Sequence, residues 1–265
     1  MTIEEDNCFC AQIFLPLYII NSLLGETDGL REKLGLKMGA NFIMIGFDFQ
    51  KEEGMEEKTG KSAETHAFYW DKLSQQHPTD VCNRTEAIYN PSREGFLLPV
   101  YHLRYLVLPK EKKILRVEWN DQTVEEELQP FFFLMVLVYL TEAKDIQPSH
   151  SWISEKDLKG GPTFFRGPHR LHVDDLETLY GKNPEAFMMA GTKLGGSEIF
   201  YGDKGFALEV FPKVPLAYVL WKGDEEFPPR IGVLLDSTIQ SHFPLDIIWC
   251  MVAETSRRLA TPSPP

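Results

Sequence analysis

The clearest concentration of reactive groups in the sequence is a run of three carboxylates, Asp224, Glu225 and Glu226, in the polar segment 222–230. A fourth carboxylate, Asp236, ends the apolar run that follows. Adjacent carboxylates repel one another unless a cation or hydrogen-bond donors compensate, and Mg²⁺ or Ca²⁺ takes oxygen ligands of this kind. The four residues are therefore candidate ligands of a divalent metal. Because neighbouring residues of an extended chain point in opposite directions, a shared site requires a bend. The alternative is a solvated loop closed by the Asp224 side chain.

A second candidate is the only close pair of histidines, His169 and His172. Residues three apart share a face on a helix, so both imidazoles could bind one metal. A structural zinc normally needs four ligands, however, and no third Cys or His lies nearby in the sequence. Arg166 and Arg170 occupy the same segment. Together with the histidines, these arginines could hold an anionic ligand in an otherwise acidic protein.

Aromatic residues make up 12% of the chain and include Trp152, Phe164 and Phe165 in segments predicted to be loops. Such side chains could line a flat, hydrophobic cofactor pocket, although packing in the core explains them equally well. The sequence lacks the motifs of phosphate-binding loops, nucleophilic serines and zinc proteases, namely GxGxxG, GxxxxGK[ST], GxSxG and HExxH. No motif therefore identifies a reaction.

The helices and strands that position these residues are predicted from hydrophobic periodicity and from Pro and Gly breakers. Pro130 precedes ten continuous apolar residues, a run too short to cross a membrane, which predicts a buried helix over 130–142. A polar connection between two β-rich runs predicts a hairpin over 103–119. The other predicted helices are 63–76, 79–85, 173–180, 184–194 and one beginning at 244; the other predicted strands are 41–49, 96–98, 100–108, 206–211, 216–221 and 231–235, with a loop over 160–168.

This order of elements predicts an α+β fold with a mainly antiparallel sheet covered by helices. We expect one globular domain over 61–260, after an N-terminal extension over 1–60 and before a frayed tail over 261–265. The charged run 50–61 is predicted to be a solvated linker.

The composition is that of a globular protein, with 43% apolar and 25% charged residues and a net charge of −12 over 265 residues. This acidity makes nucleic acids and anionic membranes unfavourable partners. The four cysteines, Cys8, Cys10, Cys82 and Cys250, give no disulfide framework and predict reduced thiols in a cytoplasmic protein. The apolar segment 8–24 follows acidic residues and has polar interruptions, so it fits neither a signal peptide nor a membrane span.

Residues 1–60 differ in pattern from the rest of the chain. They hold 11 acidic and 5 basic residues, and so half of the net charge. Three interpretations stay open: a peripheral, disordered extension, a weak membrane anchor, and translated upstream sequence with initiation at Met38, Met44 or Met55. The third is favoured because Met55 begins a polar leader directly before the first predicted helix.

The second half of the sequence contains a distinctive set of motifs. They are Phe-Pro-x-Val-Pro at 211–215, Trp-x-Gly-Asp-Glu-Glu-Phe-Pro at 221–228, and an apolar strand ending in Asp at 231–236. These motifs resemble the C-terminal part of an uncharacterised domain family of anaerobic bacteria and archaea, some of whose members carry a fused iron–sulfur cluster domain. The similarity extends back to about Ala63 and does not cover residues 1–60. This chain lacks the cysteine cluster of the fused domain, so the resemblance implies no cluster of its own. It implies no activity either, but it does imply a place in metallocofactor or corrinoid metabolism.

Three hypotheses for function follow. The first is a cytoplasmic binding or accessory protein of anaerobic metallocofactor metabolism, with a corrinoid, another tetrapyrrole or an iron–sulfur protein as its partner. Its candidate ligand-binding residues are His169, His172, Arg166, Arg170 and Trp221. The second is a metal-dependent enzyme that uses the acidic loop. The third is a protein-interaction module without a small-molecule site.

Overall fold

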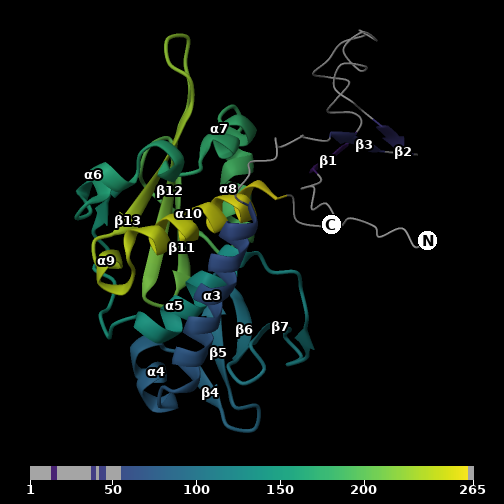
Figure 1. Ribbon diagram of the computed structural model, residues 1–265. Coiled ribbons are helices and arrows are strands. Elements are labelled where there is room, and N and C mark those ends of the chain that lie inside the picture. Colours follow the sequence, from purple (N-terminus) through teal and green to yellow (C-terminus); the bar gives the residue numbers. More distant parts are fainter. Residues whose placement is uncertain (1–12, 17–36, 40–41, 46–54, 262–265) are drawn as a thin grey trace. The chain divides into compact units, whose positions relative to one another are not determined.

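A computed structural model describes residues 13–16, 37–39, 42–45 and 55–261 of the chain (Figure 1). The chain divides into two compact units, Met1–Glu57 and Lys58–Pro265. The described part of the first unit contains an antiparallel sheet with the strand order β1–β3–β2. Its strands are β1 (Ile13–Pro16), β2 (Lys37–Gly39) and β3 (Phe42–Ile45).

The predicted short strand at 41–49 is present as β3. Most of the apolar segment 8–24, with Cys8 and Cys10, lies outside the described residues.

The second unit contains two antiparallel sheets of five strands each. The first sheet is a meander in which the strands pair in chain order. Its strands are β4 (Ile88–Asn90), β5 (Gly95–Val100), β6 (Leu103–Leu108), β7 (Lys113–Val117) and β8 (Thr123–Val124). The β6–β7 pair confirms the predicted hairpin over 103–119.

The second sheet has the strand order β10–β11–β12–β13–β9. Its strands are β9 (Trp152–Ile153), β10 (Ser197–Ile199), β11 (Lys204–Phe211), β12 (Val214–Trp221) and β13 (Arg230–Asp236). The central strand β12 is buried along its whole length except at Trp221, which explains its continuous apolar sequence, because both faces of the strand are covered.

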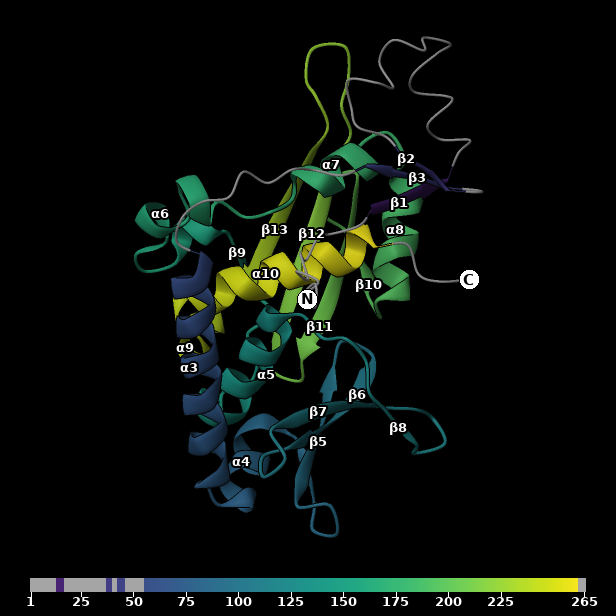
Figure 2. The ribbon, with the colours of Figure 1, turned by 45° about the vertical axis from the view of Figure 1, so that its right-hand side comes forward.

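Helices cover these sheets. The α-helices are α3 (Met55–Ser74), α4 (Pro78–Thr85), α5 (Pro130–Glu142), α6 (Gly161–Phe164), α7 (Asp174–Tyr180), α8 (Pro184–Lys193), α9 (Ile239–His242) and α10 (Leu245–Ala260), and the 3₁₀ helices are η1 (Glu155–Asp157) and η2 (Gly167–His169). α10 crosses one face of the second sheet and packs against α5 (Figure 2). None of the helices in the described residues is long and apolar enough to span a membrane.

The second unit has a hydrophobic core to which both of its sheets contribute. α5 lies at its centre, with Pro130 in the first turn and eight buried residues, as its apolar sequence predicts. The Tyr139 ring stacks on Phe211 of β11 with 4.3 Å between ring centroids. Beside this contact, the Tyr101 N–H in the β5–β6 turn donates to the Val210 carbonyl of β11 at 3.0 Å. Backbone hydrogen bonding therefore connects the first sheet directly to the second.

The predicted α+β class with antiparallel sheets is confirmed, but several element boundaries were wrong. The predicted strand 100–108 is broken at Tyr101, where a turn separates β5 from β6. α3 begins at Met55 and therefore continues through most of the predicted linker 50–61. The predicted loop 160–168 contains α6 and the start of η2. The short strands β1, β2, β4, β8, β9 and β10 were not predicted.

Candidate functional site

The structure brings the two predicted histidines together around a tryptophan of α10. The rings of His169 and His172 meet Trp249 edge-on, with centroid distances of 5.9 and 5.2 Å. Phe164 stacks on His169 at 4.6 Å, and Phe131 meets the indole edge-on at 5.4 Å. We call these five residues the Trp249 cluster. Both imidazoles are exposed and Trp249 is half-buried, so the cluster forms part of the surface.

Local backbone structure fixes this arrangement. The chain makes the short helix η2 at Gly167, whose φ of 54° is in the left-handed region that favours glycine. The buried Leu171 then anchors the segment between the two histidines. Trp249 Nε1 donates to the Arg170 carbonyl at 3.2 Å. The indole therefore holds the histidine segment through both ring contacts and a hydrogen bond.

The two arginines of the segment differ in their partners. Arg170 pairs with Asp174 Oδ2 at 2.6 Å, at the first turn of α7. Arg166 is exposed and forms no ion pair among the described residues. Only Arg166 is therefore available to an external anion without competition from a neighbouring carboxylate.

Trp221, the fifth predicted ligand-binding residue, belongs to a different surface. It ends β12, where its ring lies under the Arg230 guanidinium at 5.9 Å. Its indole nitrogen lies beside Gly202 in the β10–β11 turn. The aromatic partner of the histidines is Trp249. Trp249 belongs to the helix predicted to begin at 244, and nothing in the sequence connected it with the histidine segment.

The acidic loop adopts the closed turn that was the alternative to metal binding. Asp224 Oδ1 accepts the N–H groups of Glu226 and Phe227 at 2.9 and 2.7 Å. These two hydrogen bonds lower the pKa of Asp224, and the one from Phe227 has the larger effect. The side chains of Glu225 and Glu226 are exposed. Among the described residues, no group of three or more His, Cys, Asp and Glu side chains is arranged to hold a metal ion.

Asp236 does not join the acidic loop, because it lies at the other end of β13, about 20 Å along the strand. Its buried carboxylate accepts five hydrogen bonds between 2.6 and 3.1 Å. The donors are the N–H and hydroxyl of Ser149, the N–H of His150, and the N–H and hydroxyl of Thr238. Asp236 therefore fastens the segment after α5 to the end of β13.

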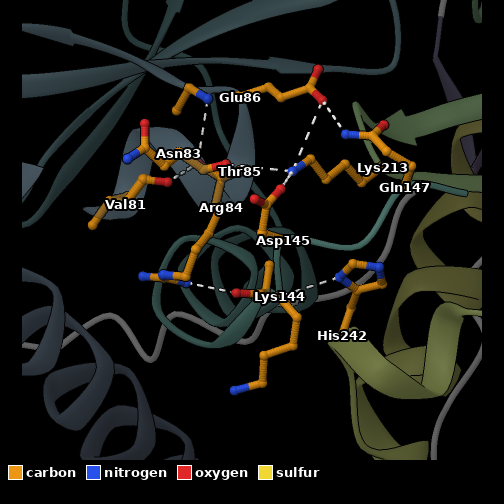
Figure 3. A network of polar contacts seen from close by, with 12 residues as sticks. Val81, Asn83, Arg84, Thr85, Glu86, Lys144, Asp145, Gln147, Lys213 and His242 are labelled. Carbon is orange, nitrogen blue, oxygen red and sulfur yellow. Dashed lines mark hydrogen bonds and ion pairs between the residues drawn. The ribbon is translucent and has the colours of Figure 1, made fainter. Parts of the chain in front are cut away.

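A polar network that sequence reasoning missed surrounds the buried Lys213 in the β11–β12 turn (Figure 3). The Lys213 side chain is 1% exposed, and its ammonium donates to Asp145 Oδ1 at 2.6 Å. Glu86 Oε1 lies 4.0 Å from the same nitrogen. His242 of α9 lies in the same network, where its Nδ1 accepts the Lys144 N–H at 3.4 Å. A lysine within the apolar run 206–221 was the available signal, but its partners lie far away in the sequence.

The two described cysteines, Cys82 and Cys250, are free thiols. Burial raises the pKa of the Cys250 thiol to about 12, and the nearby Asp246 carboxylate contributes a smaller part of this increase. A thiol with such a pKa is protonated at neutral pH and is a poor nucleophile.

Comparison with known families matches residues 77–258 to the "Domain of unknown function (DUF3786)". The chain belongs to this family. No curated protein and no solved structure matches the chain. The DUF3786 match includes the acidic loop, Lys213, both predicted histidines and Trp249, and it begins at residue 77, after the position near Ala63 where the resemblance was expected to start.

We expect His242 of this DUF3786 domain to make stability depend on pH. Its side chain is 2% exposed, and its Nε2 has no hydrogen-bond partner within the described residues. Burial and then the Lys213 cation lower the pKa of His242 below its ordinary 6.5, against the opposing charge of Asp236. Below pH 6.5 the unfolded chain therefore takes up a proton that the folded chain refuses, and stability falls until the folded pKa is reached.

We expect the free energy of unfolding, measured with urea, to decline between about pH 7.5 and pH 5. The decline should be shallower in His242→Gln, because glutamine stays neutral. Part of the decline with falling pH should remain in this variant, because burial also lowers the pKa of His66. A hydrogen bond with the Pro130 backbone opposes this shift without cancelling it. Equal slopes in the two proteins would show that His242 does not titrate with unfolding.

Proposed function

We propose that this DUF3786 protein is a binding or accessory protein of anaerobic metallocofactor metabolism, and that a corrinoid or another tetrapyrrole binds at the Trp249 cluster. The observation that carries the proposal is the pair of exposed imidazoles, His169 and His172, held around one half-buried indole. The anaerobic setting comes from the family resemblance of the 211–236 motifs.

The chemistry of the cluster suits a flat, metal-containing ligand. Aromatic faces and edges pack against planar ring systems. A neutral imidazole nitrogen is a common ligand of transition metals. The Arg166 guanidinium, exposed and without an ion pair among the described residues, would attract carboxylate or phosphate substituents at the edge of such a ring.

Metal-dependent catalysis at the acidic loop has less support from the contacts. The Asp224 carboxylate accepts hydrogen bonds from N–H groups of its own turn. The Asp236 carboxylate accepts its hydrogen bonds at the far end of β13, away from the loop. An ion bound at the loop would have only Glu225 and Glu226 as free carboxylate ligands from the predicted set, and Ca²⁺ and Mg²⁺ normally take six or more oxygen ligands.

Aquocobalamin tests the proposal, because exchange of its axial water for an imidazole nitrogen changes the visible absorption spectrum. We expect the full-length protein to produce this change on anaerobic titration. His169→Ala combined with His172→Ala should abolish it, since both exposed imidazoles of the Trp249 cluster are then gone. Hemin serves as a second tetrapyrrole in the same titration.

The matched control is His102→Ala, which removes an exposed histidine outside the Trp249 cluster and should leave the titration unchanged. Because the substituted side chains are exposed, the thermal midpoints of all variants should stay close to that of the parent protein. The proposal is wrong if neither tetrapyrrole changes its spectrum, or if the double variant responds like the parent protein.

A further inference from the structure

The loop between β12 and β13, residues 222–229, projects beyond the end of the second sheet (Figure 1). Its conformation is fixed internally. The Asp224 carboxylate accepts two backbone N–H groups, and the Asp224 N–H donates to the Phe227 carbonyl at 2.9 Å. Pro228 and Pro229 then restrict the returning chain. A loop that is already ordered loses little conformational entropy when it binds a partner.

The base of the loop is held from two sides. On one side, the Lys222 N–H donates to Asp203 Oδ2 at 2.8 Å, which ties the loop to the β10–β11 turn. On the other side, Pro229 packs against Gly181 after α7, so closely that a Cβ at Gly181 would lie 2.4 Å from the proline ring. The Ile231 N–H also donates to Glu177 Oε1 of α7 at 2.9 Å. The protein therefore maintains this projection through several separate contacts.

Large aromatic side chains are exposed at this end of the sheet. Phe200 is 97% exposed and Phe227 66%, while Tyr201 and Trp221 are 49% and 40% exposed. The antiparallel pairing of β10 to β13 places the β10–β11 turn and the β12–β13 loop at the same end. Single exposed apolar residues are common, but several at one end of a sheet are typical of an interaction surface.

Charges at the loop favour a basic partner. A hollow of about 440 Å³ lies between the loop and the segment after α7, and it is lined by three carboxylates and by Lys182 and Lys222. Glu225 and Glu226 form no ion pair among the described residues. The Arg230 guanidinium already lies over the Trp221 ring, which shows that an aromatic face here accommodates a cation.

We infer that the 222–229 loop and the aromatic residues beside it form a docking surface for a basic segment of a partner protein. Lysine or arginine side chains of the partner pair with Glu225 and Glu226, and an apolar side chain of the same segment packs on Phe227. This inference is independent of the proposed tetrapyrrole binding, because the two surfaces share no residue.

A fluorescent peptide with the unit Gly-Arg-Leu repeated four times serves as the probe, with binding to the full-length protein measured by anisotropy. Affinity should fall about tenfold or more when Gln replaces each Arg of the peptide, or Ser each Leu. It should fall to a similar extent in the protein variants Glu225→Gln/Glu226→Gln and Phe227→Ala, because these side chains are exposed and their loss leaves the fold intact.

The matched control is Glu111→Gln/Glu127→Gln, which removes two exposed carboxylates elsewhere on the surface and should leave peptide affinity unchanged. A loss in this control as large as that in the loop variant would reveal general charge attraction and overturn the inference. So would absence of peptide binding, a homodimer in light scattering that Phe227→Ala dissociates, or binding of Mg²⁺ or Ca²⁺ that Glu225→Gln/Glu226→Gln abolishes.

Discussion

Replacing Asp236 by alanine is expected to lower the free energy of unfolding by about 2–4 kcal/mol. The carboxylate is fully buried and accepts five hydrogen bonds from Ser149, His150 and Thr238. Hydrogen bonds to a charged group contribute more than those between neutral groups. Because Ser149 and His150 are exposed, water replaces part of what they lose, which keeps the expected cost below the sum of five bonds. Urea unfolding at neutral pH measures the difference.

The same residue shapes the acid side of the stability profile. Burial alone would raise the pKa of Asp236, but the hydrogen bonds from Thr238 and Ser149 outweigh it and hold the pKa below 3.8. The ionised Asp236 carboxylate therefore contributes its full stabilisation of the folded state above the pKa that it has in the unfolded chain. This stabilisation is lost as the pH falls through its pKa in the folded chain. The difference in free energy of unfolding between Asp236→Asn and the parent protein should therefore become smaller as the pH falls.

Asp224→Asn is the matched control for Asp236. Asp224 also accepts backbone N–H groups, but it is exposed and its bonds close only its own turn, so we expect a cost below about 1 kcal/mol. A small effect at Asp236 would contradict the fastening role. Stabilisation of the parent protein by Mg²⁺ or Ca²⁺, lost in Asp236→Asn, would instead identify this carboxylate as a metal ligand.

The fold was predictable where a single segment carries its own signal. Pro130 and the apolar run behind it predicted α5 and its burial, and both are present. The break between β5 and β6 had no such signal, because the turn is made by Tyr101 and His102 without Gly or Asn. Tyr101 adopts a φ of 56°, and its buried hydroxyl contacts Thr255 Oγ1 of α10 at 2.9 Å. Contacts distant in the sequence therefore select this turn over a continuous strand.

For the candidate sites too, the sequence revealed only what lies within one segment. The histidine segment was found because its members are neighbours in the sequence, whereas Trp249 contacts them from a helix about 80 residues later. Asp236 was grouped with the acidic loop because both lie next to the same apolar strand. In the structure the loop precedes the first residue of β13 and Asp236 is its last residue, so the length of the strand separates them. Lys213 sits within an apolar run, which indicates a buried charge that needs a partner. Pattern alone gave no means to choose Asp145 as that partner.

The ion pair between Lys213 and Asp145 is expected to respond asymmetrically to substitution. Lys213 is 1% exposed while the side chain of Asp145 is 70% exposed, so the cost of removing a charge from water falls almost entirely on the lysine. Asp145→Ala should lower the free energy of unfolding by about 2–3 kcal/mol, because it leaves a buried cation whose contacts among the described residues are then the Asn83 carbonyl at 3.5 Å and Glu86 Oε1 at 4.0 Å. Lys213→Met should cost less than about 1 kcal/mol, because methionine fills the space and both carboxylates can face water.

The double variant Lys213→Met/Asp145→Ala decides between this account and a simple attractive pair. With the ammonium gone, nothing remains for Asp145 to compensate, so we expect the double variant to be as stable as Lys213→Met alone and more stable than Asp145→Ala. Urea unfolding of the three variants and the parent protein completes the cycle. If Lys213→Met costs as much as Asp145→Ala, the buried ammonium is itself a source of stability. If the two costs add, the two residues are not coupled across the 2.6 Å contact.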